Sequence, residues 1–238
     1  MQVSIILPTY NEKENVKHLI PRIFKVFKDN KINGNVIVVD DNSPDRTADA
    51  VKELQKSNPI LLIERSEKMG LGTAYIVGFK KALENGSDVI FEMDADLSHD
   101  PVNIPDFLKK INDGFDVVIG SRRIEGGKSI GLNWYRNLIS WGGSFIGKHV
   151  AGIDSVSDIP SGYRAYKKDV LEGIDLDGIK SSGLAFQLEM LGKCIKIDLK
   201  VGDIPIVFQE RYSGQSKFST RDVINFFLTA LKIRLGLN

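Results

Sequence analysis

Short apolar segments recur along the first half of the chain and alternate with longer, helix-like stretches. The segments are typical of buried strands in a parallel sheet; they are Val3–Leu7, Val36–Val39, Ile60–Ile63, Val89–Phe91 and Asp116–Gly120. Between them we predict helices that end near Phe27 and Gln55, one that opens at Gly70-Leu71-Gly72, and one over Pro101–Ile111. This alternation predicts right-handed βαβ units in a Rossmann-like, doubly wound and mostly parallel α/β sheet.

Two of these helices begin at recognisable sequence signals. Asn11 followed three residues later by Glu14 is typical of a capping box, so we expect Asn11 to cap the first helix. Ser43-Pro44 is a natural start for the second helix. The third helix opens at a glycine pair, but Tyr75 stands where a dinucleotide-binding fingerprint needs a third glycine. We therefore expect those glycines to serve a tight turn and close helix packing.

The rhythm changes after residue 124. Gly126 and Gly127 predict a flexible loop. Beyond it we predict helices over Leu132–His149, Phe186–Leu191 and Thr220–Leu235, and strands over Ser161–Tyr166, Ile195–Leu199 and Ile204–Phe208. Because no repeat, low-complexity tract or linker interrupts the chain, we expect one domain over residues 1–238, with halves at 1–124 and 125–238.

Composition and charge are those of an ordinary globular protein. Hydrophobic residues make up 42% of the 238 residues, and 32 Lys and Arg face 31 Asp and Glu. This balance does not favour a nucleic-acid partner, and any phosphate site must be built locally. Cys194 is the only cysteine, which favours a reducing compartment and a core role for its thiol. We see no signal peptide and no apolar stretch of ~20 residues that could span a bilayer.

The stretch with the clearest chemistry follows the fourth predicted strand. Asp94 and Asp96 stand one residue apart, so on an extended backbone their side chains point to the same side. Ligands bind outside the carboxyl ends of strands in open α/β sheets. Two carboxylates with coordination positions left over suit Mg²⁺ or Mn²⁺ shared with substrate phosphates. The alternative is that Asp94 caps a turn and Asp96 is solvated.

Other strand ends carry polar side chains as well. Tyr10 and Glu12 follow the first strand, and Asp40 and Asp41 follow the second. A carboxylate pair in this position could bind a ribose, although one of the two could instead cap the next helix.

Five motifs in order give the chain a family resemblance. They are Leu7-Pro8-Thr9-Tyr10-Asn11-Glu12, Val39-Asp40-Asp41-Asn42-Ser43-Pro44-Asp45, Asp94-Ala95-Asp96-Leu97-Ser98-His99, Gly120-Ser121-Arg122 and Arg211-Tyr212-Ser213-Gly214-Gln215-Ser216-Lys217. The chain resembles inverting glycosyltransferases with a glycosyltransferase-A fold, and more narrowly the dolichyl-phosphate mannosyltransferases. The resemblance runs from Val3 to about Leu231, and its last motif is the most specific to polyprenyl-phosphate sugar synthases.

The resemblance implies a role for each matching residue. Nucleotide-sugar binding would fall to Pro8, Tyr10, Glu12, Val39, Asp41, Asp94 and Ala95. Asp96 would ligate Mg²⁺ or Mn²⁺, together with Asp94 and Ser98. Arg122, Arg211 and Lys217 would contact the donor's diphosphate and sugar, with Arg211, Lys217 and Asp96 as the catalytic residues. Arg136 and Ser140 would approach the acceptor phosphate. Some relatives have Gln at Ser98, Arg at Trp141 and Lys at Ser182, so Arg164 could replace a missing charge.

The reaction implied by the resemblance is inverting, metal-dependent mannosyl transfer from GDP-mannose to dolichyl or another polyprenyl phosphate. The enzyme would be peripheral at the cytoplasmic face of a membrane. It could recruit small membrane subunits, and the C-terminal amphipathic helix could lie at the membrane surface or close the core. Alternatives are transfer of glucose or N-acetylglucosamine from a UDP-sugar, a non-catalytic nucleotide-sugar-binding subunit, and a nucleotidyltransferase. The last would usually show a basic, glycine-rich loop where Pro8–Glu12 stands.

Overall fold

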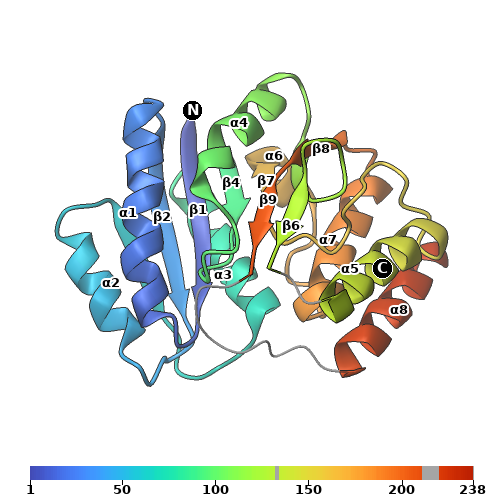
Figure 1. The fold of residues 1–238 in the computed structure, drawn as a ribbon, viewed down its shortest axis with the longest axis horizontal. Coiled ribbons are helices and arrows are strands. Elements are labelled where there is room, and N and C mark those ends of the chain that lie inside the picture. Colours follow the sequence, from blue (N-terminus) through green and yellow to red (C-terminus); the bar gives the residue numbers. More distant parts are fainter. Residues whose placement is uncertain (132–133, 211–219, 238) are drawn as a thin grey trace.

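The computed structural model describes residues 1–131, 134–210 and 220–237, without the side chains of residues 134–137 and 220–221. Within these ranges a seven-stranded sheet forms the centre of the molecule, and helices cover both faces (Figure 1). Its strands, in spatial order, are β3 (Ile60–Glu64), β2 (Asn33–Asp40), β1 (Gln2–Thr9), β4 (Val89–Glu92), β7 (Arg164–Lys167), β5 (Val117–Ser121) and β8 (Val201–Pro205). The mostly parallel, doubly wound α/β sheet predicted from the sequence is confirmed.

One strand runs against the others. β7 is antiparallel to both β4 and β5, whereas β1 to β4 are mutually parallel and β5 is parallel to β8. A separate two-stranded ribbon joins β6 (Lys128–Ile130) to β9 (Val207–Gln209). The loop expected at Gly126 and Gly127 therefore leads directly into a short strand.

The helices divide into two layers. The layer over one face consists of α1 (Lys13–Asp29), α2 (Thr47–Gln55), the 3₁₀ turn η1 (Pro101–Asn103) and α4 (Ile104–Asn112). The opposite layer contains α3 (Leu71–Glu84), α6 (Lys168–Gly173) and α7 (Gly183–Lys196). α5 (Trp134–His149) and α8 (Thr220–Arg234) lie beyond α7, where α8 contacts both α5 and α7.

Alternation along the strands builds the two cores. In β1, Val3, Ile5 and Leu7 face the α1 layer, while Ile6 faces the α3 layer. All four are fully buried, as a strand covered on both sides requires. Cys194, on α7, is buried in the α3-side core, which confirms its expected core role.

The first helix is capped differently from the sequence prediction. Asn11 has a left-handed φ of 61°, and no side chain caps α1 locally. Instead the backbone N–H groups of Asn11, Glu12 and Lys13 donate to Ser43 Oγ, Thr47 Oγ1 and Asp45 Oδ2, each at 3.0 Å. The capping-box prediction is therefore wrong, because a loop distant in sequence supplies the acceptors.

The chain after α7 also departs from the prediction. Residues 195–199, expected as a strand, finish α7 and the turn after it, and the strand that pairs with β5 begins at Val201. The predicted strand at 204–208 is divided between β8 and β9.

The close packing expected at Gly72, in α3, is confirmed. A Cβ added at this position would lie 2.9 Å from both Phe186 and the carbonyl oxygen of Ser181.

Candidate active site

The sheet order creates a place for a ligand between β1 and β4. The chain winds outward from β1 to β2 and β3, and then returns to β4 on the other side of β1. At such a switch point the loops after the two neighbouring strands separate and leave a crevice. A cavity of about 560 Å³ lies here, and its wall comprises Pro8, Thr9, Tyr10, Glu12, Asp41, Lys68, Gly70, Leu71, Ala74, Asp94, Ala95, Asp96, Pro160, Gly162, Ser182, Gly183, Leu184, Gln187 and Asp222.

The loop after β4 presents the paired aspartates to this cavity. Tyr75 donates a hydrogen bond from its hydroxyl to Asp94 Oδ1 at 3.2 Å, and the Ser98 backbone N–H donates to Asp96 Oδ1 at 3.1 Å. Leu97, which lies between Asp96 and Ser98, adopts a left-handed φ of 66°. The backbone N–H of Asp94 donates to His99 Nδ1 at 3.1 Å, and burial lowers the pKa of His99, so its Nδ1 is held as an acceptor.

A buried polar network supports the aspartates from below. Glu92, the last residue of β4, accepts hydrogen bonds from Tyr166 at 2.8 Å and from Gln187 Nε2 at 2.7 Å. Burial raises the pKa of Glu92 to about 7, against the opposing charge of Arg164. Arg164 is fully buried and donates to the backbone carbonyls of Ile159, Ser161 and Gln187. The network therefore ties β4 and β7 to the first turns of α7.

Asp41 anchors the opposite side of the cavity. It forms a buried ion pair with Arg65, and its Oδ2 accepts the backbone N–H groups of Met69 and Gly70 at 3.2 and 3.3 Å. These bonds fix the turn that enters α3. Lys68, from the same turn, places its ammonium 4.4 Å from the centre of the Tyr10 ring. The aromatic ring and the carboxylate therefore occupy one wall, as expected for a nucleoside site.

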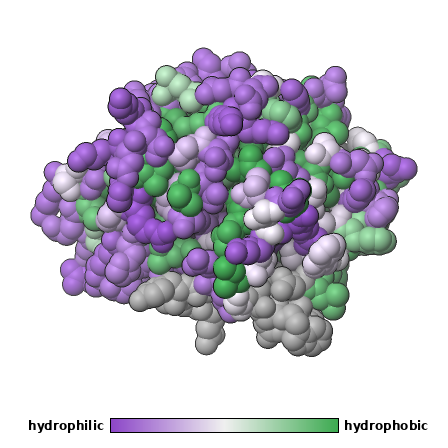
Figure 2. All heavy atoms as spheres, turned by 45° about the horizontal axis from the view of Figure 1, so that its top comes forward, coloured by the Kyte–Doolittle hydropathy of each residue, from purple (hydrophilic) through white to green (hydrophobic). Residues whose placement is uncertain are grey.

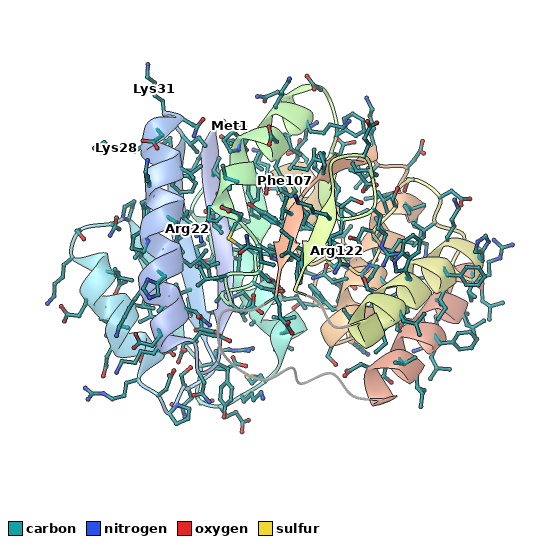
Figure 3. All side chains as sticks on the ribbon, in the orientation of Figure 1. Met1, Arg22, Lys28, Lys31, Phe107 and Arg122 are labelled. Carbon is teal, nitrogen blue, oxygen red and sulfur yellow. The ribbon has the colours of Figure 1, made fainter. Side chains whose placement is uncertain are left out.

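A second polar cluster gathers around Asp158. Arg122 donates to this fully buried carboxylate from Nε at 2.6 Å, Nη2 at 2.7 Å and its backbone N–H at 3.0 Å. Burial alone would raise the pKa of Asp158, but its bonds to Arg122 and the charges of Arg122 and Arg123 lower it. Nη2 of both arginines donates to Ser140 Oγ at 2.8 Å, which places Arg122 beside α5 (Figure 3).

The structure brings most of the predicted binding residues into one wall. Pro8, Tyr10, Glu12, Asp41, Asp94, Ala95 and Asp96 all line the cavity. Val39 does not, because its side chain is fully buried in the α3-side core. Arg122 and Ser140 meet in the second cluster. Arg211 and Lys217 lie outside the described residues, as does the side chain of Arg136.

Several residues in and around the cavity were not predicted from the sequence. Pro160, Gly162, Ser182 and Gln187 belong to the second half of the chain and reach the cavity only through the placement of β7 and α7. Arg65 and Lys68 follow β3, so the rule that ligands bind at carboxyl ends of parallel strands could have found them. Asp158 precedes β7 in a segment without a recognisable motif.

The chemistry of the β4 loop fits a hard divalent ion. Within the described ranges, no group of three or more His, Cys, Asp and Glu side chains is placed to hold a metal. Asp94 and Asp96 supply two carboxylates, and Ser98 Oγ is buried without a hydrogen-bond partner in the described part of the chain. Two carboxylates and one hydroxyl would leave Mg²⁺ or Mn²⁺ dependent on further oxygen ligands, as is usual at sites shared with phosphates.

Comparison with known proteins places the chain in a family. The sequence profile of glycosyl transferase family 2 matches residues 4–175. Undecaprenyl-phosphate mannosyltransferase of Micrococcus luteus is 42% identical over 92% of this chain and 88% of its own length. Polyprenol monophosphomannose synthase of Mycolicibacterium smegmatis is 37% identical over 92% and 82%. Dolichol-phosphate mannosyltransferase of Pyrococcus furiosus is 39% identical over 95% of this chain but 62% of its own length.

Solved structures give the same fold. Glucosyl-3-phosphoglycerate synthase from Mycobacterium tuberculosis, in complex with Mn²⁺, uridine diphosphate and phosphoglyceric acid, superposes with a TM-score of 0.72. It covers 99% of this chain and 78% of that one at 15% identity. The sheet and its switch-point cavity thus define a glycosyltransferase-A fold, and the chain is a glycosyltransferase. It belongs to glycosyl transferase family 2.

Proposed function

We propose that the protein transfers mannose from GDP-mannose to a polyprenyl phosphate, with inversion at the sugar carbon and with a divalent metal bound at the β4 loop. The observation that carries the proposal is the cavity at the switch point, where Asp94 and Asp96 face Tyr10 and Asp41. Relatives named for mannosyl transfer to undecaprenyl, polyprenol and dolichol phosphates support the sugar and the acceptor class.

The donor occupies the cavity in a defined direction. Its base and ribose lie against Pro8, Tyr10, Glu12 and Asp41, all on the β1 and β2 side. Its diphosphate and sugar lie toward Asp94, Ala95 and Asp96. Asp94, Asp96 and the Ser98 hydroxyl would hold the metal. When bound, the ion would supply charge stabilisation to the leaving diphosphate, and Arg211 and Lys217 would add to it.

The acceptor needs no general base from the protein. A phosphate monoester has a second pKa near ~6, so it is largely dianionic at neutral pH and already nucleophilic. Catalysis then rests on alignment of the two substrates and on stabilisation of the departing GDP. Attack in line with the leaving group inverts the sugar carbon and gives a β-linked mannosyl phosphate.

An apolar surface beside the second cluster suits an acceptor that resides in a membrane. On α5, Leu138, Trp141 and Phe145 are exposed at helical spacing, with Trp141 64% exposed. On α8, Phe226, Thr229 and Ala230 are buried, whereas Val223, Ile224, Phe227, Leu228 and Leu231 are exposed. We call these exposed residues of α5 and α8 the apolar surface. Hydrophobic side chains appear at the lower right of Figure 2, on the side where both helices lie in Figure 1.

The position of α8 is compatible with both roles expected for the last helix, which are closing the core and lying at the membrane surface. One face of α8 closes the core against α7, and the other is presented outward with Lys232 and Arg234 in its last turn. No helix in the described ranges is long and apolar enough to cross a bilayer. We infer that α5 and α8 rest on the membrane surface, because apolar side chains flanked by basic ones favour that position.

Transfer of labelled mannose from GDP-mannose to a polyprenyl phosphate in detergent tests the proposal. We expect a lipid product that forms only with a divalent ion and releases one GDP per mannose transferred. UDP-glucose and UDP-N-acetylglucosamine serve as matched donors. Faster transfer from either would overturn the mannosyl assignment, and GDP release without a lipid product would overturn the acceptor.

A further inference from the structure

We propose that Arg123 binds the phosphate of the acceptor, as a second guanidinium beside Arg122 and the Ser140 hydroxyl. This inference rests on the proposed function and assigns a residue that the family resemblance does not mark. It comes from the charge balance and bonding around Asp158.

Two guanidinium groups share one carboxylate in this cluster. Arg122 takes both oxygens of Asp158 through hydrogen bonds of 2.6 and 2.7 Å, whereas Arg123 Nε forms a longer ion pair of 3.4 Å with Asp158 Oδ1. The side chain of Arg123 is only 8% exposed. Among the described residues, two guanidinium charges thus share one ion-pair partner, at a place that water reaches poorly. A buried cation of this kind is costly unless an anion joins it.

The cluster keeps several unused hydrogen-bond donors. Ser140 Oγ already accepts from Nη2 of both arginines, so its own hydrogen points away from them and can be donated. Among the described residues, none accepts a hydrogen bond from Nη1 of Arg122 or Arg123. The two guanidinium groups and the hydroxyl therefore keep donors of the kind that phosphate oxygens accept.

The surroundings of Arg123 indicate that the anion carries an apolar tail. Its guanidinium lies 4.6 Å from the centre of the Trp141 ring, and Trp141 belongs to the apolar surface. The stacking fixes the plane of the guanidinium. On α5, the Ser140 side chain thus belongs to the arginine cluster, whereas the next residue, Trp141, lies on the exposed side of the helix. A phosphate bound at Arg123 would have its hydrocarbon chain beside α5.

Kinetics with a short soluble acceptor, farnesyl phosphate, test this assignment. We expect Arg123→Gln to raise the KM for farnesyl phosphate by about 10- to 100-fold, the range of one charge-assisted hydrogen bond. The KM for GDP-mannose should stay within about twofold, since the donor cavity does not include Arg123. Lys128→Gln is the matched control, because Lys128 is an exposed cation on the adjoining strand β6.

The possible results separate the assignment from the proposed function. Equal acceptor KM in Arg123→Gln and Lys128→Gln would refute the role of Arg123 alone, whereas no transfer by the unaltered protein would refute the acceptor class. If Arg123→Gln does not fold, Arg123→Lys decides the matter, since lysine keeps the charge but not the planar fork. An acceptor KM at least about threefold above that of the unaltered protein supports the role, and an unchanged KM overturns it.

Anionic lipid headgroups offer the same phosphate chemistry, so binding to phosphatidylglycerol vesicles is measured in parallel. We expect Arg123→Gln to bind these vesicles as the unaltered protein does. Weaker vesicle binding with an unchanged farnesyl phosphate KM would assign the cluster to headgroups and overturn the proposal.

Discussion

Ser98 and Asp96 illustrate what single residues decide in this site. The Ser98 backbone N–H donates to Asp96, while its hydroxyl is buried without a partner among the described residues. A buried hydroxyl without a hydrogen bond is costly. A metal bound by Asp94, Asp96 and the Ser98 hydroxyl, as proposed, would give this hydroxyl a partner.

Replacing Asp96 with Asn should therefore abolish metal-supported transfer. We expect kcat to fall by on the order of 100-fold or more, with thermal unfolding of the apo protein little changed. Asp100→Asn is the control, because Asp100 caps η1 and pairs with Arg22 rather than lining the cavity. Near-normal turnover of Asp96→Asn with added Mg²⁺ or Mn²⁺ would remove Asp96 from the metal site.

Asp203 gives a prediction on pH. Its Oδ2 accepts the Ser157 backbone N–H at 2.7 Å, its Oδ1 is buried with no hydrogen-bond partner among the residues that the structure describes, and burial raises its pKa above 3.8. The folded state thus holds this proton more tightly than the unfolded state, so ionisation of Asp203 lowers stability as pH rises from 3.8 through the raised pKa.

Asp203→Asn should accordingly raise the free energy of unfolding at pH 8, with a gain that shrinks toward pH 4. Urea denaturation across that range measures the effect. Exposed Asp113, changed to Asn, serves as the reference. A gain independent of pH would show that something other than ionisation of Asp203 is responsible.

The residues that motifs could identify are those that follow strands directly. Asp94 and Asp41 meet because β4, β1 and β2 are parallel neighbours, and the alternating pattern already implied this. Val39 was expected in the same pocket, but the two-residue period of β2 turns it to the core. Gln187 could not be predicted, because the sequence of a helix does not indicate which of its side chains lines a cavity.

Among the elements, the loop before α2 has a role that local sequence rules could not reveal. Ser43, Asp45 and Thr47 accept the backbone N–H groups of the three residues at the start of α1, Asn11 to Lys13, and so tie α1 to α2. Capping rules consider residues next to a helix, whereas these acceptors lie about thirty positions away in sequence. The start of α1 therefore depends on β2 and its following loop being in place.

Asp45→Ala should lower the free energy of unfolding by about 1 to 2 kcal/mol, since Asp45 accepts both the Lys13 and the Thr47 backbone N–H groups. Glu14→Ala tests the local capping box, and we expect a smaller loss than for Asp45→Ala, because Glu14 pairs with Lys17 at the surface. Chemical denaturation compares the two. A larger loss for Glu14→Ala would restore the local cap.

Residues 195–199 show why one strand was misplaced. Ile195, Ile197 and Leu199 alternate with polar residues, which is the period of a half-buried strand. In the structure α7 continues to Lys196, and Ile195 and Leu199 pack against the α3-side core. A short stretch of this kind satisfies either period, and only the pairing of Val201 with Val117 decides where β8 begins.

The whole molecule is asymmetric, with the proposed donor cavity at the sheet and the apolar surface on α5 and α8.

The double variant Ile224→Ser, Leu228→Ser should weaken binding to anionic vesicles by about tenfold or more, because burial of each side chain contributes about 1.5 to 3 kcal/mol. Vesicle sedimentation measures this. Val102→Ser, at an exposed apolar residue of η1, should leave binding unchanged. Equal losses in both would indicate nonspecific contact.

The antiparallel strand β7 has a consequence for the nascent chain. Residues 1–124 carry both aspartates, yet β4 and β5 acquire their shared neighbour only when Arg164–Lys167 arrives between them. Until then each has an open edge of unpaired backbone groups, which favours association with other chains. On the ribosome, the sheet closes only after Pro205 at the end of β8 has emerged, so synthesis must deliver most of the polypeptide before Asp94 and Asp96 have a complete sheet beneath them.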